Sequence, residues 1–289
     1  MNWALVFSII AASLLFNIFK YFEKYKVVTL NAIIVNYLIA SSLSFIVPNE
    51  TKSISYAIEQ PWFPTTLILG FLFVSLFQLM AYSSQKISIA TTTIANKITF
   101  VFPTTMGILF FKEDWSIIKI AGFIVAIISI ILTTENKKGL PKRDSILIIG
   151  LLFFGGGLLE SLLNYSSKNW IAVGDTSLYF GYLFFFAFFF GLIMMIWKII
   201  HGQRLPSKKD IIWGILLGVP NYISMYMLLK SLEDLPSSSV FPIANMGVIL
   251  CSTFLSVILF KERISIKKAL ALGCSILAII LISFYDYFY

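Results

Sequence analysis

Residues 88–113 read SIATTTIANKITFVFPTTMGILFFKE, and residues 237–262 read SSSVFPIANMGVILCSTFLSVILFKE. The two stretches align without a gap at an offset of 149 residues, which places Ile-Ala-Asn on Ile-Ala-Asn and Phe-Lys-Glu on Phe-Lys-Glu. An ungapped match that includes Asn, Lys and Glu is hard to obtain by chance in an apolar chain. It predicts that the chain arose by duplication.

The register extends well beyond these two stretches. An offset of 149 holds downstream of Phe-Lys-Glu, and an offset of 148 relates the beginnings of the two halves. We therefore expect two repeats, residues 1–140 and residues 141–289. The additional matches are Ser116 with Ser265, Ile117 with Ile266, Lys119 with Lys268, residues 13–15 with residues 161–163, and Lys20 with Lys168.

The composition places these repeats in a membrane. The 289 residues are 58% hydrophobic and only 12% charged, with a mean hydropathy of +0.89. A water-soluble surface needs about 25–35% charged residues, so a soluble enzyme is excluded. Ten apolar segments are about as long as the roughly 20 residues that cross a bilayer. These segments are residues 2–19, 27–47, 64–84, 88–111, 115–134, 145–165, 176–200, 211–229, 237–260 and 265–284.

The number of segments in each repeat, five, determines how the second repeat is oriented relative to the first. Because five is odd, the second repeat enters the membrane from the side opposite to the first. This is the inverted-topology arrangement of secondary transporters, in which the binding site lies near the bilayer midplane. The expected fold is an all-α integral membrane protein with ten transmembrane helices in two inverted five-helix repeats.

The basic residues predict which side faces the cytoplasm. The chain has 22 Lys+Arg and 14 Asp+Glu, and the basic residues fall in short clusters between apolar segments rather than on one nucleic-acid-binding face. Sixteen of them lie in or beside the odd-numbered connections and five on the other side, while Lys97 lies within a segment. Cytoplasmic loops retain Lys and Arg, so both termini are expected outside. The membrane is expected to be a bacterial inner membrane.

With these features the sequence resembles the drug/metabolite transporter superfamily, in particular its ten-helix EamA-type members. The resemblance covers the whole chain. It rests on the five-plus-five helix count, on the helix that ends in Phe-Lys-Glu in each half, and on the hydroxyl-rich tracts at residues 88–93 and 237–239. It implies a carrier that alternates between inward-open and outward-open states, with the solute held by helices one to four and six to nine. Many EamA relatives keep the N-terminus in the cytoplasm, and the charge distribution here argues the reverse.

Lys97 is the strongest candidate for a functional residue. It lies about 13 Å into its apolar segment, where a charge costs about 2.5 to 3.5 kcal/mol on insertion scales, and its stem is too short to reach the headgroups. We expect it to face a cavity, where it binds an anionic group or changes protonation during the transport cycle. Asn96-Lys97-Ile98 also resembles the corresponding stretch of nucleotide-sugar and sugar-phosphate carriers, which favours an anionic solute.

Glu160 is the second charged candidate. Gly156, Glu160 and Asn164 are spaced at i, i+4 and i+8, so they share one face of a helix. The carboxylate is expected to be the proton site of a coupled cycle or the partner that neutralises Lys97. The alternative is that it lies near the membrane surface and reaches outer water. In the repeat, Lys97 corresponds to Met246 and Glu160 to Ala12, so each half adds one charge that the other lacks.

Neutral polar residues and prolines complete the predicted site. Hydrogen bonding between helices is the ordinary role of a single polar residue in a membrane. Prolines break backbone hydrogen bonds and kink helices, which either creates a point of bending or fixes a static shape. The predicted solute-binding residues are Lys97, Asn96, Gln78, Tyr82, Glu160, Asn164, Asn221, Ser224 and Asn245, and the predicted kinks are at Pro103, Pro220 and Pro242.

The function expected from these residues is secondary transport of a small anionic or zwitterionic metabolite, with no cofactor, metal or nucleic acid. A membrane-embedded enzyme acting on lipid is disfavoured, because the sequence has no His-Glu-x-x-His and no paired intramembrane aspartates. A channel or non-transporting scaffold is the other alternative. Since no nucleotide-binding Gly-x-x-x-x-Gly-Lys-Ser/Thr motif exists, energy must come from a proton or other gradient, or from a separate subunit. Solute identity, transport direction and the choice between monomer and homodimer are left open by the sequence.

Overall fold

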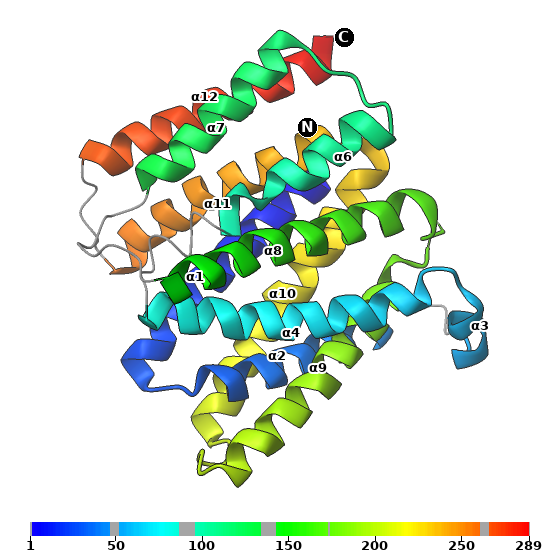
Figure 1. Ribbon diagram of the computed structural model, residues 1–289, viewed down its shortest axis with the longest axis vertical. Helices are drawn as coiled ribbons and strands as arrows, with labels where there is room; N and C mark the ends of the chain where they lie inside the picture. The colour runs from blue at the N-terminus through cyan, green and yellow to red at the C-terminus, as the bar shows by residue number, and fades with distance from the viewer. Residues whose placement is uncertain are drawn as a thin grey trace. The chain divides into compact units, whose positions relative to one another are not determined.

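The computed structural model describes residues 2–46, 52–86, 96–133, 143–172, 174–260 and 266–288, and every regular element over these residues is a helix. Figure 1 shows the helices in chain order. They are α1 (Trp3–Tyr25), α2 (Thr29–Ile46), α3 (Ile54–Glu59), α4 (Phe63–Lys86), the 3₁₀ helix η1 (Ile98–Phe100), α6 (Val101–Phe110), α7 (Ile117–Thr133), α8 (Arg143–Asn169), α9 (Thr176–Ile200), α10 (Lys208–Asp234), α11 (Ser237–Phe260) and α12 (Ile266–Phe288).

The helices are apolar enough for a membrane. Six of the described helices contain a window long and apolar enough to cross a bilayer, and these are α2, α4, α8, α9, α10 and α11. Four further apolar stretches are shorter: Trp3–Phe19, Ile98–Phe110, Ile117–Leu132 and Ala269–Ile282. The prediction of an all-α integral membrane protein is confirmed at this level. The short helix α3, capped by the Ser53 hydroxyl, was not predicted and lies between the predicted segments 27–47 and 64–84.

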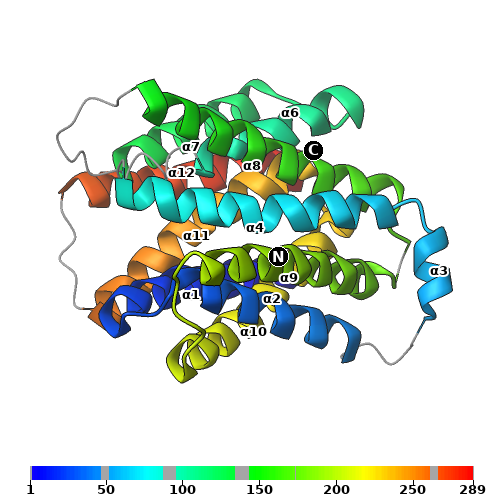
Figure 2. The same ribbon diagram turned by 60° about the horizontal axis from the view of Figure 1, so that its bottom comes forward.

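The chain forms two compact units, each described here by itself. The first unit comprises residues 3–78 and 165–233, and the second comprises residues 79–164 and 234–289. Each unit therefore draws helices from both predicted repeats. In the first unit α2 packs along α9, and in the second α7 packs along α12 and α6 packs along α11. Figures 1 and 2 both show α7 and α12 side by side.

The core of the first unit is aromatic where α2 meets α9. The rings of Tyr37 and Phe184 stack with their centroids 6.1 Å apart, and both side chains are fully buried. The phenylalanine-rich run at residues 180–190 is divided between this core and the exterior, because Phe180 is fully buried whereas Phe185 and Phe189 are about half exposed. Such a helix has one face for its neighbours and one for lipid.

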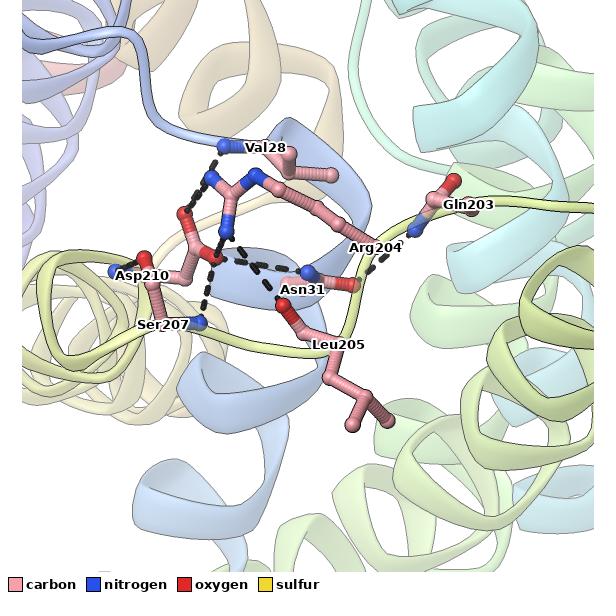
Figure 3. Close-up of polar contacts among 7 residues, drawn as sticks. All are labelled: Val28, Asn31, Gln203, Arg204, Leu205, Ser207 and Asp210. Carbon is pink, nitrogen blue, oxygen red and sulfur yellow. Dashed lines mark hydrogen bonds and ion pairs between the residues drawn. The ribbon is translucent and has the colours of Figure 1, made fainter.

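One carboxylate joins three segments of the first unit (Figure 3). Asp210 is fully buried and accepts hydrogen bonds from the backbone of Val28 at 2.9 Å and of Ser207 at 2.8 Å. Asn31 also donates a hydrogen bond to the Asp210 carboxylate. Arg204 donates to the same carboxylate from both of its terminal nitrogens, at 2.8 and 3.1 Å. The Ser207 hydroxyl oxygen in turn accepts a hydrogen bond from the Asp210 backbone N–H at 3.4 Å, which completes a capping box at the start of α10.

A second carboxylate fixes the start of α11 in the second unit. Glu113 lies between α6 and α7 and accepts hydrogen bonds from the backbone and hydroxyl of Ser237 and from the backbone of Ser238, at 2.7 to 2.9 Å. Burial alone would raise the pKa of the Glu113 carboxyl. The hydrogen bonds outweigh that effect and hold its pKa below the usual value. Glu262, the repeat mate of Glu113, lies outside the described residues.

Candidate functional site

Lys97 lies where the backbone leaves regular α geometry. Asn96 and Lys97 are helical, the next three residues form the 3₁₀ turn η1, and α6 follows directly. Pro103 has no N–H to donate to the carbonyl of Thr99, four residues earlier, so a regular turn cannot form there. The Thr99 hydroxyl instead donates to the Asn96 carbonyl at 2.6 Å. A 3₁₀ stretch inside a longer helix is typical of hinges and functional sites.

The Lys97 amine is buried and has a defined acceptor. Its side chain is 8% exposed, and Nζ donates a hydrogen bond to Oδ1 of Asn245 on α11 at 3.1 Å. The Asn245 amide nitrogen donates to the Phe241 carbonyl at 3.1 Å, which turns the amide oxygen toward the lysine. Asn245 is thus oriented by its own helix before it meets the amine.

Glu160 approaches the same place from α8. A Cβ atom added at Gly156 would lie 2.7 Å from Cγ2 of Thr99, and one added at Gly157 would overlap the ring of Phe102. These two glycines therefore let α8 approach η1 and α6 closely. One turn after Gly156, the Glu160 carboxylate interacts electrostatically with Lys97 and lies next to the Thr99 side chain.

The resulting site contains two opposite charges, Lys97 and Glu160, with neutral polar side chains beside them. Glu160 is half-buried, and its Oε2 atom is shielded from solvent without a hydrogen-bond partner among the described residues. Two buried charges are tolerated when they compensate each other, whereas removing either one leaves the other uncompensated at a cost of about 3–5 kcal/mol. The ammonium can bind an anionic group, and the carboxylate can bind a cationic group or a proton.

Two asparagines extend the site along α8 and η1. Asn164 is fully buried and its amide nitrogen lies 3.5 Å from the Pro103 carbonyl, a long hydrogen bond. Its Oδ1 atom and the hydroxyl of nearby Thr104 are buried without a partner in the described part of the chain. Asn96 donates to the sulfur of Met80 at 3.5 Å, a weak partner for an amide. These groups retain hydrogen-bonding capacity close to the charges.

Of the remaining predicted residues, three belong to the first unit and one belongs to the second. Gln78 belongs to the first unit, where its Oε1 accepts from Lys198 at 3.4 Å. Asn221 and Ser224 are also in the first unit, and the Ser224 hydroxyl donates to the Asn221 carbonyl at 2.9 Å. Tyr82 is in the second unit but is 51% exposed.

The predicted prolines differ from one another in their effect on the backbone. Pro103 follows the 3₁₀ turn, whereas α10 and α11 remain helical through Pro220 and Pro242. Sequence reasoning missed Thr99, the residue that both Gly156 and Glu160 meet. The signal in the sequence that could have identified Thr99 is its position four residues before Pro103, because the proline has no N–H to donate to the Thr99 carbonyl. The hydroxyl-rich tract at residues 88–93 lies outside the described residues.

Within the described ranges, no group of three His, Cys, Asp or Glu side chains is close enough to hold a metal ion. The two cysteines, Cys251 and Cys274, are free.

Comparison with known proteins gives this chemistry a family context. Residues 147–284 match the model of the EamA-like transporter family. A Haemophilus influenzae protein described only as uncharacterized is 26% identical over 291 residues, which are 98% of each chain. A Helicobacter pylori protein described as an uncharacterized transporter is 22% identical over 171 residues, 56% of this chain and 54% of that one. A crystal structure of another protein superimposes with a TM-score of 0.80 at 11% identity, over 99% of this chain and 97% of that one, which shows a shared fold alone.

The family match, the transporter among the relatives and the apolar helices agree with the resemblance drawn from the repeat and the Phe-Lys-Glu helices. Such a protein lies in a lipid bilayer and acts on a small molecule. Over residues 147–284 the chain matches the EamA-like transporter family, in agreement with its resemblance to the EamA-type members of the drug/metabolite transporter superfamily.

Proposed function

We propose that this transporter is a secondary carrier that works by alternating access, with two inverted five-helix repeats at residues 1–140 and 141–289. The packing of repeat mates supports this. The register of the sequence pairs α2 with α9, α6 with α11 and α7 with α12, and in each pair the two helices pack against each other. Inverted repeats are related by a two-fold axis in the membrane plane. A helix that lies near this axis therefore packs against the corresponding helix of the other repeat.

The solute site of this carrier is centred on Lys97, Glu160 and Asn245. The observation that carries this proposal is the Lys97 ammonium, buried at 8% exposure and hydrogen-bonded to Asn245. An ionisable residue inside a membrane protein is costly and marks a substrate or ion pathway by default. Asn96 and Asn164 supply the neutral polar groups, while Gln78, Tyr82, Asn221 and Ser224 are proposed as further solute contacts.

The charges indicate the class of solute. An anionic group can replace the Glu160 carboxylate beside Lys97 without leaving the ammonium uncompensated. A zwitterion can satisfy both partners at once, since its cationic group matches Glu160. With either solute, the contact between Lys97 and Glu160 is replaced by contacts between these residues and the charged groups of the solute. We therefore propose a small anionic or zwitterionic metabolite, with Glu160 also serving as the proton site of the cycle.

The first test uses Lys97→Ala in proteoliposomes, with Lys230→Ala as the matched control because Lys230 is exposed. A thermal-shift screen of the purified protein against amino acids, nucleosides and phosphorylated sugars identifies the solute. Lys97→Ala is expected to insert normally but to abolish solute-dependent flux and thermal stabilisation. Uptake equal to that of the Lys230→Ala control removes Lys97 from the binding site.

The second test uses Glu160→Gln, which keeps the shape of the side chain but cannot exchange a proton. The pH dependence of flux should disappear while the protein remains folded. Flux is measured at a series of external pH values with the solute found in the screen. An unaltered pH profile assigns Glu160 to structure rather than to coupling.

Orientation and assembly complete the proposal. The carrier is placed in a bacterial inner membrane with both termini outside, as the Lys and Arg distribution predicts. Energy is proposed to come from a proton or other ion gradient, in a monomer or a homodimer. No observation on the described residues favours the lipid-acting enzyme or the channel.

A further inference from the structure

A group of three stacked aromatic rings lies at the junction of α1 and α10 in the first unit. The Trp213 ring lies 5.4 Å from the Tyr21 ring and 5.2 Å from the Tyr25 ring, with interplanar angles of 21° and 29°. The other side of Trp213 meets Phe22 edge-on at 6.3 Å, and Trp213 packs against the buried cluster formed by Phe22, Val27, Ala32 and Leu217. The rings are thus held by the core and presented at its edge.

The position of these rings along their helices places them at the boundary of the bilayer. The apolar part of α1 ends at Phe19, but the helix continues to Tyr25, so Tyr21 and Tyr25 lie just beyond the apolar stretch. Trp213 lies near the start of the apolar helix α10. Tyr and Trp at this level contact lipid headgroups with one end of an otherwise apolar ring. Tyr25 is 40% exposed and therefore accessible to such a headgroup.

One lysine contacts the rings and three others lie close to them in the sequence. The Lys24 ammonium lies 5.9 Å from the centre of the Tyr21 ring and 5.5 Å from that of Tyr25, within the range of cation–π interactions. Lys26 follows α1 directly, and Lys208 and Lys209 begin α10 one turn before Trp213. These four lysine side chains are exposed.

Asp210, the carboxylate that follows Lys209 in the sequence, is already occupied by other groups. Both oxygens of Asp210 are already used by N–H groups of Val28, Asn31, Arg204 and Ser207 (Figure 3), and the side chain is fully buried. Arg204 is therefore the cation that Asp210 compensates. In the sequence, residues 20–28 carry three Lys and one Glu, so the excess of positive charge extends to the end of α1.

We infer that Tyr21, Lys24, Tyr25, Lys209 and Trp213 form a binding site for the headgroup of an anionic phospholipid. The lysine ammonium groups bind the phosphodiester, and the aromatic rings contact the glycerol and the upper acyl chains. Basic pockets between membrane helices recognise anionic headgroups in this way, and each cation near the surface contributes about 1 kcal/mol. This site does not depend on the identity of the transported solute.

The test measures lipid binding to the delipidated full-length protein in detergent by native mass spectrometry. The probes are phosphatidylglycerol, which carries a net negative charge, and phosphatidylcholine, which carries none. Glycerol phosphate is the third probe, since it offers the same phosphate without acyl chains. We expect phosphatidylglycerol to bind at least about 10-fold more tightly than either of the other two. Equal binding of phosphatidylcholine overturns the charge argument, and equal binding of glycerol phosphate overturns the assignment to a lipid.

The matched variants locate the site. Lys24→Gln with Lys209→Gln should weaken phosphatidylglycerol binding by about 10- to 30-fold. The control pair is Lys112→Gln with Lys230→Gln, which removes two exposed lysines elsewhere and should change binding less than 2-fold. Tyr25→Leu tests the ring separately and should weaken phosphatidylglycerol while leaving glycerol phosphate unchanged. If both lysine pairs weaken binding equally, the effect is one of net charge and the site is refuted.

Discussion

Substituting Gly156 by alanine tests whether close packing of α8 forms the candidate site. Alanine is favoured over glycine inside a helix by about 0.5–1 kcal/mol, so the change should stabilise the protein if space were available. The new Cβ would lie 2.7 Å from Cγ2 of Thr99, which real Cβ atoms do not tolerate. Thr99 is fully buried and its hydroxyl bond to Asn96 fixes its rotamer, so the side chain cannot rotate away without losing that bond.

Gly150 supplies the matched control for this substitution. It lies on the same helix, and nothing is within 4 Å of a Cβ added there. Gly150→Ala should therefore show the helix-propensity gain alone. Overpacking of a core costs about 1–3 kcal/mol, so Gly156→Ala should be less stable than Gly150→Ala by that amount. At about 2–4 °C per kcal/mol for a chain of this size, the two melting temperatures should differ by roughly 2–12 °C.

The assay is thermal unfolding of both variants in the same detergent at one scan rate, followed by intrinsic fluorescence. A fixed rate is needed because unfolding of membrane proteins is often irreversible. Solute-dependent stabilisation is then measured on each variant, since displacing α8 moves Glu160 relative to Lys97. If Gly156→Ala melts at or above the temperature of Gly150→Ala, α8 does not approach η1 closely and the argument for the site geometry is wrong.

Two further predictions concern the carboxylates that join segments. Asp210→Ala leaves the backbone N–H groups of Val28 and Ser207 without their acceptor and should lower stability by about 3 kcal/mol. Arg204→Ala should cost less, because Asp210 keeps its hydrogen bonds from Val28, Asn31 and Ser207 and the lost partner is half exposed. Thermal unfolding ranks the two variants, and equal losses contradict the network. Because its native pKa is lowered, Glu113 should stabilise the protein above the unfolded-state pKa of about 4.3 and lose this contribution as pH falls through the native pKa. Glu113→Gln should flatten the acid side of a plot of melting temperature against pH, and an unchanged plot would argue against the cap.

Much of the fold followed from the sequence, and the reason is local. In a membrane every backbone polar group must be satisfied within its own segment, so apolar length alone predicts helices. The apolar stretches of α8, α9 and α11 coincide with predicted segments within a few residues. The choice of Lys97 as a candidate also followed from the sequence, because a charge in the middle of an apolar segment is costly. Helix α3 could not be predicted from the sequence, since its six residues have no long apolar pattern.

The sequence by itself determined a membrane protein of apolar helices, a duplicated pattern, and the identity of the two charges placed inside it. Only the tertiary structure decided which groups meet those charges. Asn245 is 148 residues away from Lys97 and was one of several neutral polar candidates until α11 placed its amide oxygen on the amine. Thr99 became important only because two glycines let α8 approach it. Hydropathy is read residue by residue, whereas hydrogen bonds between distant helices depend on how those helices pack.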